Sequence, residues 1–174
     1  MAGGSLMAGY FSTSSFPNNS PSRDELINLW KISGEVALEY ADAMPEKYYH
    51  FRPGDSGELY SYGGQMQHIA ENIVRLLDQY ITDMAPPELP LENESDKAAI
   101  RKNIQSSTDY GTEAIRSLDR HELMETVDFF AGPLPRWHVL FIAQDHTAHH
   151  IGQSVIYLRV CGVSPPRWRK WPAN

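Results

Sequence analysis

The sequence predicts an all-α protein built as a four-helix bundle, and three observations carry this prediction. Four long segments place apolar residues at steps of three and four, which is the spacing of one helix face. No segment shows the strict alternation of polar and apolar residues that is typical of a half-buried strand. Prolines, glycines and helix-capping residues stand at the ends of the four segments. This pattern favours the packing of helices on helices around one core.

The first two expected helices flank an aromatic loop. The first helix is predicted to begin after Ser22, a favourable N-cap, and to end before Pro45. The loop that follows mixes prolines, glycines and aromatic residues, which indicates irregular structure. The second helix is predicted from Gly57 or Glu58 to about Met84. Its apolar stripe consists of Met66, Ile69, Ala70, Ile73, Leu76, Leu77, Tyr80 and Ile81.

The proline-rich connector APPELPLENES separates the second helix from the third. Its length predicts a crossover along the bundle instead of a tight hairpin. The third helix is predicted from about Asp96 to Leu118, with Ser95 or Asn93 as its N-cap. The fourth helix is predicted from Pro135 to Val160, because proline suits the first turn of a helix and Gly162 suits the cap at its end.

Length, charge and cysteine content limit the possible functions. A chain of 174 residues suits one domain, which we place at residues 22–166 between flexible tails at 1–21 and 167–174. The formal net charge of −7 argues against nucleic acid and against an anionic membrane surface as partners. No apolar run is long enough to cross a membrane, and the first residues do not resemble a secretory signal. The single cysteine, Cys161, cannot form an internal disulfide, so the expected location is the cytoplasm.

The stretch DHTAHHIGQ, residues 145–153, holds three of the seven histidines. A helix advances about 100° per residue, so His146 and His150 lie on one face, one turn apart. Two imidazoles with this spacing can bind one metal ion, but at least one further ligand must come from another helix. The spacing also arises by chance in a chain with seven histidines, so the pattern alone leaves both interpretations open.

The third ligand has several candidates, namely His50, His68, His121, His138 and His149. His149 points to a flanking direction of the same helix, and His121 lies in a polar stretch between helices. On a helical wheel His68 lies off the apolar stripe, in a group with Ser61, Gln65, Asn72 and Arg75. Periodicity therefore predicts a surface or cleft-lining position for His68, which suits a metal site in an open cleft and not one on the bundle axis.

Two segments of the chain resemble the DinB-like proteins, a metalloenzyme family also called DinB/YfiT-like. The segment MPEKYYHFRPGDSGELYSYGGQMQHIAENI is similar to their aromatic loop and to the helix with an early histidine that follows it. The segment DHTAHHIGQSVIYLRVCGVSPP is similar to their signature helix, with matches at His146, His150, Gly152, Gln153, Tyr157, Leu158, Gly162, Pro165 and Pro166. The resemblance covers about Ser22 to Pro166 and implies His68 as the third ligand. It departs at Ile151, where the family usually has arginine.

The resemblance implies a four-helix bundle with a crossover, often assembled as a homodimer. It also implies a divalent metal, commonly zinc or nickel, held by His68, His146 and His150. Three neutral imidazoles leave one position on such a metal open, which is the pattern of catalytic sites. Characterised relatives include transferases and isomerases that use low-molecular-weight thiols such as mycothiol or bacillithiol.

We therefore expect a small-molecule substrate and either a thiol-dependent S-transferase or a hydrolase that uses metal-bound water. The alternative is a non-enzymatic, stress-linked dimeric bundle that binds a metal or a small ligand. A third interpretation is a structural dimer whose histidines are vestigial.

Further residues are expected around the site. Gln65, Asn72, Asp145 and Gln153 are candidates for orienting the imidazoles, while no residue stands out as a general base. The aromatic residues Tyr48, Tyr49, Phe51, Tyr60 and Tyr62 could wall a pocket, although a packed loop over one bundle end is the preferred interpretation. Because metal binding requires neutral histidines, metal occupancy is expected to fall below about pH 6.5. Apolar residues on several faces of the fourth helix, namely Phe141, Ile151, Val155 and Leu158, predict a dimer interface.

Overall fold

The structure, a computed structural model, describes residues 22–54, 57 and 59–167. Within these residues four long helices form the bundle: α1 (Arg23–Ala43), α2 (Tyr62–Tyr80), α3 (Lys97–Ser117) and α5 (Arg136–Val160). The predicted fold class is confirmed. The predicted tail at 1–21 lies outside the described residues, as does the C-terminal tail beyond Arg167. None of the helices described is long and apolar enough to cross a membrane.

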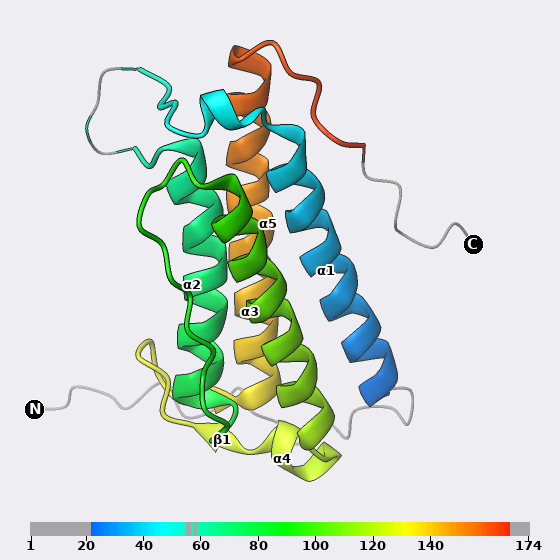
Figure 1. Cartoon of the computed structure of the whole chain (residues 1–174). Helices are drawn as coiled ribbons and strands as arrows, with labels where there is room; N and C mark the ends of the chain where they lie inside the picture. The colour runs from blue at the N-terminus through cyan, green and yellow to red at the C-terminus, as the bar shows by residue number, and fades with distance from the viewer. Residues whose placement is uncertain (1–21, 55–56, 58, 168–174) are drawn as a thin grey trace, which may run out of the picture.

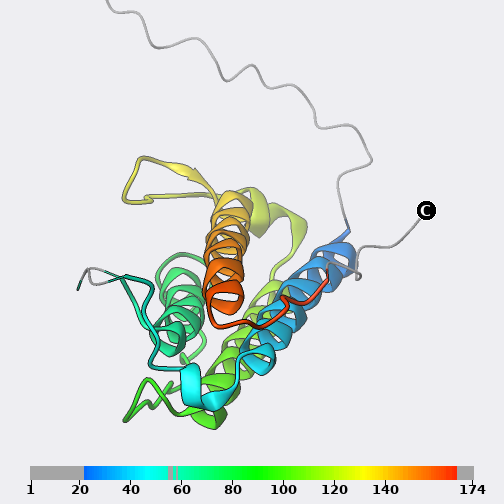
Figure 2. The same cartoon turned by 90° about the horizontal axis from the view of Figure 1, so that it is seen from above.

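The long connector between α2 and α3 is a crossover, as its length predicts. Figure 1 shows that α2 and α3 run in one direction along the bundle, whereas α1 and α5 run in the other. The connector returns along the bundle from the end of α2 to the start of α3. Helix α3 packs against α1 and α2, and Figure 2 shows α5 between α2 and α1. Helices α2 and α5 therefore lie side by side and antiparallel.

The aromatic loop before α2 packs against one end of the bundle and contains a short 3₁₀ helix, η1 (Glu46–Tyr48). Tyr49 and Tyr62 are completely buried. A buried hydroxyl needs a hydrogen-bond partner, and each of these donates to a backbone carbonyl of α1, of Ala41 and Tyr40 respectively, at 2.6 Å. For these two tyrosines the packed-loop interpretation is therefore correct.

The loop also determines where α2 begins. Ser61 is the N-cap, and its hydroxyl accepts a hydrogen bond from the Gly64 amide at 2.9 Å. The Tyr62 and Gly63 amides donate to loop carbonyls of Phe51 and Tyr49. These bonds satisfy the free amides of a helix start, so the predicted start at Gly57 or Glu58 is wrong. The predicted end near Met84 is also wrong, since α2 ends at Tyr80.

The other long helices follow the prediction closely. Ser22 caps α1 in a capping box with Glu25, and Gly162 has a φ of +74° just past the end of α5. Helix α3 is capped by Asp96 itself, because the Asn93 side chain accepts from the Ser95 amide instead. The stretch between α3 and α5 contains α4 (Arg120–Met124) and an antiparallel pair, β1 (Thr126–Val127) with β2 (Leu134–Pro135). These elements are too short to show a periodicity in the sequence.

The apolar residues of α5 divide between the core and the surface. Ile151 and Leu158 are buried in the core of this chain, and Val155 is partly buried. Ile151 and Leu158 are therefore not available for a dimer interface, and for these two residues the sequence prediction is wrong. The side chains of Phe141, Ile156 and Val160 are exposed, at 63%, 58% and 61%. Helix α5 packs against α1, α2 and α4, which accounts for its buried apolar residues on more than one face.

Candidate metal centre

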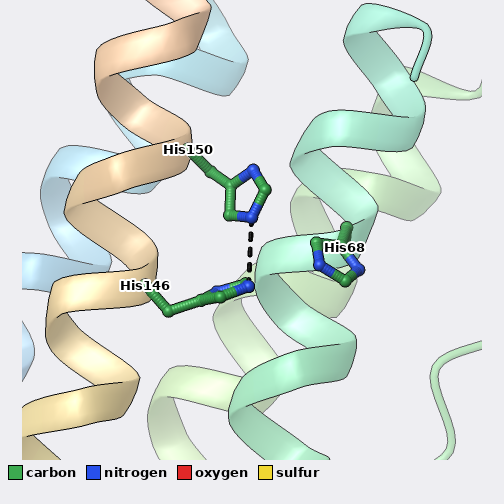
Figure 3. Close-up of side chains that lie close together, drawn as sticks. All are labelled: His68, His146 and His150. Carbon is green, nitrogen blue, oxygen red and sulfur yellow. Dashed lines mark hydrogen bonds between the residues drawn. The ribbon is translucent and has the colours of Figure 1, made fainter. Parts of the chain in front are cut away.

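The antiparallel contact between α2 and α5 brings three histidines together. His68 comes from α2, and His146 and His150 come from successive turns of α5 (Figure 3). One ring nitrogen from each lies within 4.8 Å of the other two. The residues that the sequence and the family resemblance select are therefore neighbours in space.

The spacing of the nitrogen atoms fits one small metal ion. The Nε2 atoms of His146 and His150 face each other at 3.0 Å. Two nitrogen ligands of a tetrahedral zinc ion, each bonded at about 2.1 Å, lie about 3.4 Å apart. The His68 ring centroid is 5.0 Å from that of His146 and 4.9 Å from that of His150. Small rotations of the three rings would therefore bring all of them onto one ion.

Burial keeps these histidines in the neutral form that metal binding requires. Desolvation, reinforced by the neighbouring imidazoles, lowers the pKa of His146 to about 4 and that of His150 to about 4. Desolvation also lowers the pKa of His68, against the opposing effect of Glu71. Neutral imidazoles offer a free electron pair to a cation without a proton being removed first. At neutral pH the three rings are therefore in the protonation state that a metal site would need.

Two glutamines surround His150. The Gln65 side-chain nitrogen lies 2.7 Å from Nδ1 of His150 and also donates to the side-chain oxygen of Gln153. The Gln153 nitrogen in turn lies 2.9 Å from Nε2 of His149. Both glutamines are among the residues that the sequence suggests for orienting the imidazoles. Asp145, another of those candidates, is exposed on α5.

Two buried polar atoms near the cluster have no hydrogen-bond partner among the residues that the structure describes. They are Nδ1 of His146 and the side-chain oxygen of Asn72, a residue one helical turn after His68 on α2. A buried polar atom without a partner costs free energy, so such atoms are rare outside functional sites. When Nε2 of a histidine binds a metal, its Nδ1 carries the proton. The unpaired Nδ1 of His146 therefore fits a ring that is held mainly through Nε2.

Within the described part of the loop, Tyr60 is the aromatic residue that stacks on the cluster. Its ring lies over the His68 ring with a centroid distance of 5.1 Å and an interplanar angle of 21°. Its side chain is 49% exposed, and its carbonyl accepts a hydrogen bond from the Tyr157 hydroxyl at 2.9 Å. Tyr60 therefore forms one accessible wall of the candidate site. The sequence groups it with four other aromatic residues and cannot distinguish it from them.

The remaining histidines lie in other environments. His149 is exposed on α5, as its helical direction predicts, and His50 is exposed in the loop. His121 lies 3.5 Å from the Glu125 carboxylate, and the ring of His138 contacts that of Trp137. Ile151, at the position where the resemblance suggests arginine, is 2% exposed within the core. This chain therefore has an apolar core residue where an arginine would shape the site or an interface.

The comparisons with known proteins agree with this fold. The family model of the DinB superfamily matches residues 29–154. The structure is similar to that of a DinB-like protein from Bacillus cereus ATCC 10987, with a TM-score of 0.68, 18% identity, and coverage of 83% of this chain and 95% of that chain. It is also similar to a conserved protein from Enterococcus faecalis, with a TM-score of 0.57, 14% identity, and coverage of 81% and 97%. No curated protein matches the chain.

Proposed function

The chain belongs to the DinB superfamily, and from this membership and its three-histidine cluster we propose that it is a metal-dependent enzyme acting on a small molecule. The observation that carries the proposal is the convergence of His68, His146 and His150 at the contact of α2 and α5. We propose zinc or nickel as the metal, because both ions accept imidazole ligands.

The donor set supports catalysis over a purely structural role. Structural zinc sites have four protein ligands, whereas catalytic sites keep a position open for water or substrate. Here the cluster offers three ligands, and His68 and His146 are only partly buried. A bound divalent ion would lower the pKa of a thiol or a water molecule at the open position and so supply a nucleophile.

We favour a thiol-dependent S-transferase, in which a low-molecular-weight thiol attacks an electrophilic substrate. Three neutral imidazoles leave the full positive charge of the ion to attract an anionic sulfur. The chain's own residues would hold the three rings, and Tyr60 would offer an apolar surface to the acceptor. Hydrolysis by the same site is the second candidate. A cytoplasmic location completes the proposal, because such thiols are kept reduced there.

Metal analysis of the untagged protein tests the site. We expect about one equivalent of a divalent metal in the wild type and its loss in His68→Ala, His146→Ala and His150→Ala. His138→Ala is the matched control, because this histidine lies on the same helix but outside the cluster, and it should keep the metal. Unchanged metal content in any of the three cluster variants would exclude that residue as a ligand.

Activity assays then separate the enzyme from a metal-binding protein. The purified protein would be incubated with several low-molecular-weight thiols and with electrophilic acceptors or ester substrates. Turnover should stop on chelation and return when zinc or nickel is added back. Turnover that chelation does not change would exclude a metal mechanism. Metal binding without turnover would favour the non-enzymatic alternative.

We also propose a homodimer that buries the exposed apolar residues of α5. Phe141, Ile156 and Val160 lie within one sector of that helix, and large exposed apolar side chains favour association. Light scattering should give twice the mass of the chain for the wild type, and a Phe141→Asp, Ile156→Asp variant should be a monomer. A monomeric mass for the wild type would overturn this assignment.

A further inference from the structure

We propose that Gln65 and Gln153 form a reversible hydrogen-bond relay that positions His150 for the metal and transmits metal binding to His149 on the surface. The inference rests on the proposed metal site. It assigns to the two glutamines a positioning role, because they contact a ligand side chain and not the reacting atoms. The contacts that link the four side chains run from α2 to the exposed face of α5.

In the structure, the direction in which each hydrogen bond of this relay is donated corresponds to the metal-free protein. The Gln65 amide nitrogen uses one hydrogen for Nδ1 of His150 and the other for the oxygen of Gln153. Because Nδ1 of His150 accepts, the proton of this neutral ring is on Nε2. That Nε2 proton points to Nε2 of His146 at 3.0 Å, and the His146 proton is consequently on the buried, unpaired Nδ1. At the other end, the Gln153 nitrogen donates to Nε2 of His149.

This polarity is incompatible with a metal on Nε2 of His150. A metal ligand needs the free electron pair of Nε2, so the proton of that ring must move to Nδ1. Nδ1 would then face the Gln65 nitrogen, and two donors would oppose each other at 2.7 Å. One of these groups must change when the metal binds.

A half-turn of both carboxamides removes this opposition of two donors. After the rotation the Gln65 oxygen accepts from Nδ1 of His150 and, through its second lone pair, from the Gln153 nitrogen. The Gln153 oxygen then faces Nε2 of His149, which must carry the proton to donate to it. The three contacts of the relay are kept, and each again joins one donor to one acceptor. The exchange of oxygen and nitrogen within a carboxamide needs almost no additional space, so the buried Gln65 can make it without repacking.

The relay has two consequences. First, after the amides have turned, the Gln65 oxygen accepts from Nδ1 of His150. This contact favours the tautomer that leaves Nε2 free for the metal. Second, the relay makes the tautomer of the exposed His149 depend on the metal, since Nε2 of His149 changes from acceptor to donor. His149 precedes Ile156 by two helical turns, so both lie on the same exposed face of α5. Metal binding therefore changes the hydrogen-bonding character of His149 on the face of α5 that carries Ile156.

Nuclear magnetic resonance of the full chain tests the relay without an activity assay. Long-range proton–nitrogen spectra at pH 8 distinguish the two neutral tautomers, and the His149 signals are identified by their loss in His149→Asn. We expect the Nδ1-protonated form in the metal-free protein and a shift toward the Nε2-protonated form as one equivalent of Zn²⁺ is added. If zinc binds and the His149 tautomer does not change, the relay is overturned while the metal site stands. If zinc does not bind, both proposals fail.

Two substitutions at Gln65 sharpen the test. A carboxylate at this position would have two acceptor oxygens and no donor, so Gln65→Glu should hold His149 in the Nε2-protonated form with or without zinc. Gln65→Leu interrupts the relay, so the His149 response to zinc should disappear and zinc affinity should fall about 10- to 100-fold. Gln67→Leu is the matched control, because this buried glutamine of α2 bonds to Asn103 instead of to the site. A normal His149 response in Gln65→Leu would contradict the relay.

Discussion

His146 and His150 make the stability of the metal-free protein depend on pH. In the folded protein their pKa values are lowered to about 4 by burial and by the neighbouring imidazoles, whereas an unfolded histidine has a pKa of about 6.5. Between these values the unfolded chain binds more protons than the folded one, so stability falls as the pH falls. The stability is complete above about pH 6.5 and is lost progressively toward pH 4.

Urea denaturation of the metal-free protein measures this effect. The midpoint should decrease between pH 7 and pH 5, and the decrease should be smaller in the His146→Gln, His150→Gln double variant. His121→Gln, which changes an exposed histidine, should leave the pH dependence as it is in the wild type. An equal pH dependence in the wild type and the double variant would show that the two rings are not held neutral by folding. The lowered pKa values also move the expected loss of metal to more acidic conditions than about pH 6.5.

Tyr60 should contribute to metal affinity through its stacking on His68. Stacked aromatic pairs contribute about 0.5–1.5 kcal/mol, so Tyr60→Ala should weaken zinc binding about twofold to tenfold, while Tyr60→Phe keeps the stack and the affinity. Calorimetric titration with zinc measures the change. Leu59→Ala serves as the control, because this neighbouring side chain is similarly exposed, at 43%. Equal zinc affinity in Tyr60→Ala and Leu59→Ala would show that the stack does not contribute to metal binding.

The three candidate ligands differ in how well the sequence predicts them. Helical spacing places His146 and His150 on one face as a candidate pair, since four residues make about one turn, but it leaves a chance arrangement open. His68 does not, because it lies off the apolar stripe of its own helix, and the family resemblance was needed to select it. The structure shows why: α2 meets α5 along an edge of its buried face, and there His68 is only partly buried. The pairing of Gln65 with Gln153 depends on the antiparallel register of α2 and α5, which no local pattern contains.

At the scale of elements, the crossover connector joins the aromatic loop in supporting the start of α2. The Glu94 carboxylate accepts hydrogen bonds from the Ser61 hydroxyl and from Arg52, which joins the connector to the loop and to the N-cap of α2. The Glu94 carbonyl oxygen passes so close to Gly63 that an added Cβ would lie 1.7 Å from it. Position 63 therefore requires glycine, because the contact is with backbone that cannot move independently.

Gly63→Ala should lower both stability and zinc affinity. The methyl group would displace the connector or the first turn of α2, and His68 is located little more than one turn further along that helix. Thermal unfolding and zinc titration measure the two effects. Gly152→Ala is the matched control, since this helical glycine of α5 has open space around it and alanine favours a helix by about 0.5–1 kcal/mol. If Gly63→Ala is as stable as Gly152→Ala, the close approach of the Glu94 carbonyl to position 63 does not limit stability.

The long elements were predictable because each carries several turns of amphipathic pattern and recognisable caps. The start of α2 was not predictable in this way. The amides of Tyr62 and Gly63 donate to carbonyls of Phe51 and Tyr49, which lie outside the helical pattern of α2. The short α4 and the β1–β2 pair also escape prediction, because two to five residues contain no measurable period. Local sequence therefore predicts the bundle and the starts of α1, α3 and α5, while contacts between elements determine where α2 starts.

At the scale of the whole molecule, the candidate metal centre connects two helices that are far apart in the chain. His68 lies on α2, and its partners lie on α5, about eighty residues later. A metal that binds only the folded arrangement must therefore stabilise the whole bundle by mass action. At a free metal concentration about 100 times its dissociation constant, this stabilisation amounts to about 2.7 kcal/mol.

For a chain of this size, that free energy corresponds to a rise of about 5–10 °C in the unfolding temperature. Differential scanning calorimetry with and without zinc measures the rise in the wild type. His150→Ala should show no rise, because two remaining imidazoles cannot hold the ion at that concentration, whereas His138→Ala should rise as the wild type does. A rise of the same size in His150→Ala would place the stabilising ion elsewhere. A wild type that zinc does not stabilise would show that the three histidines do not form a site in the folded protein.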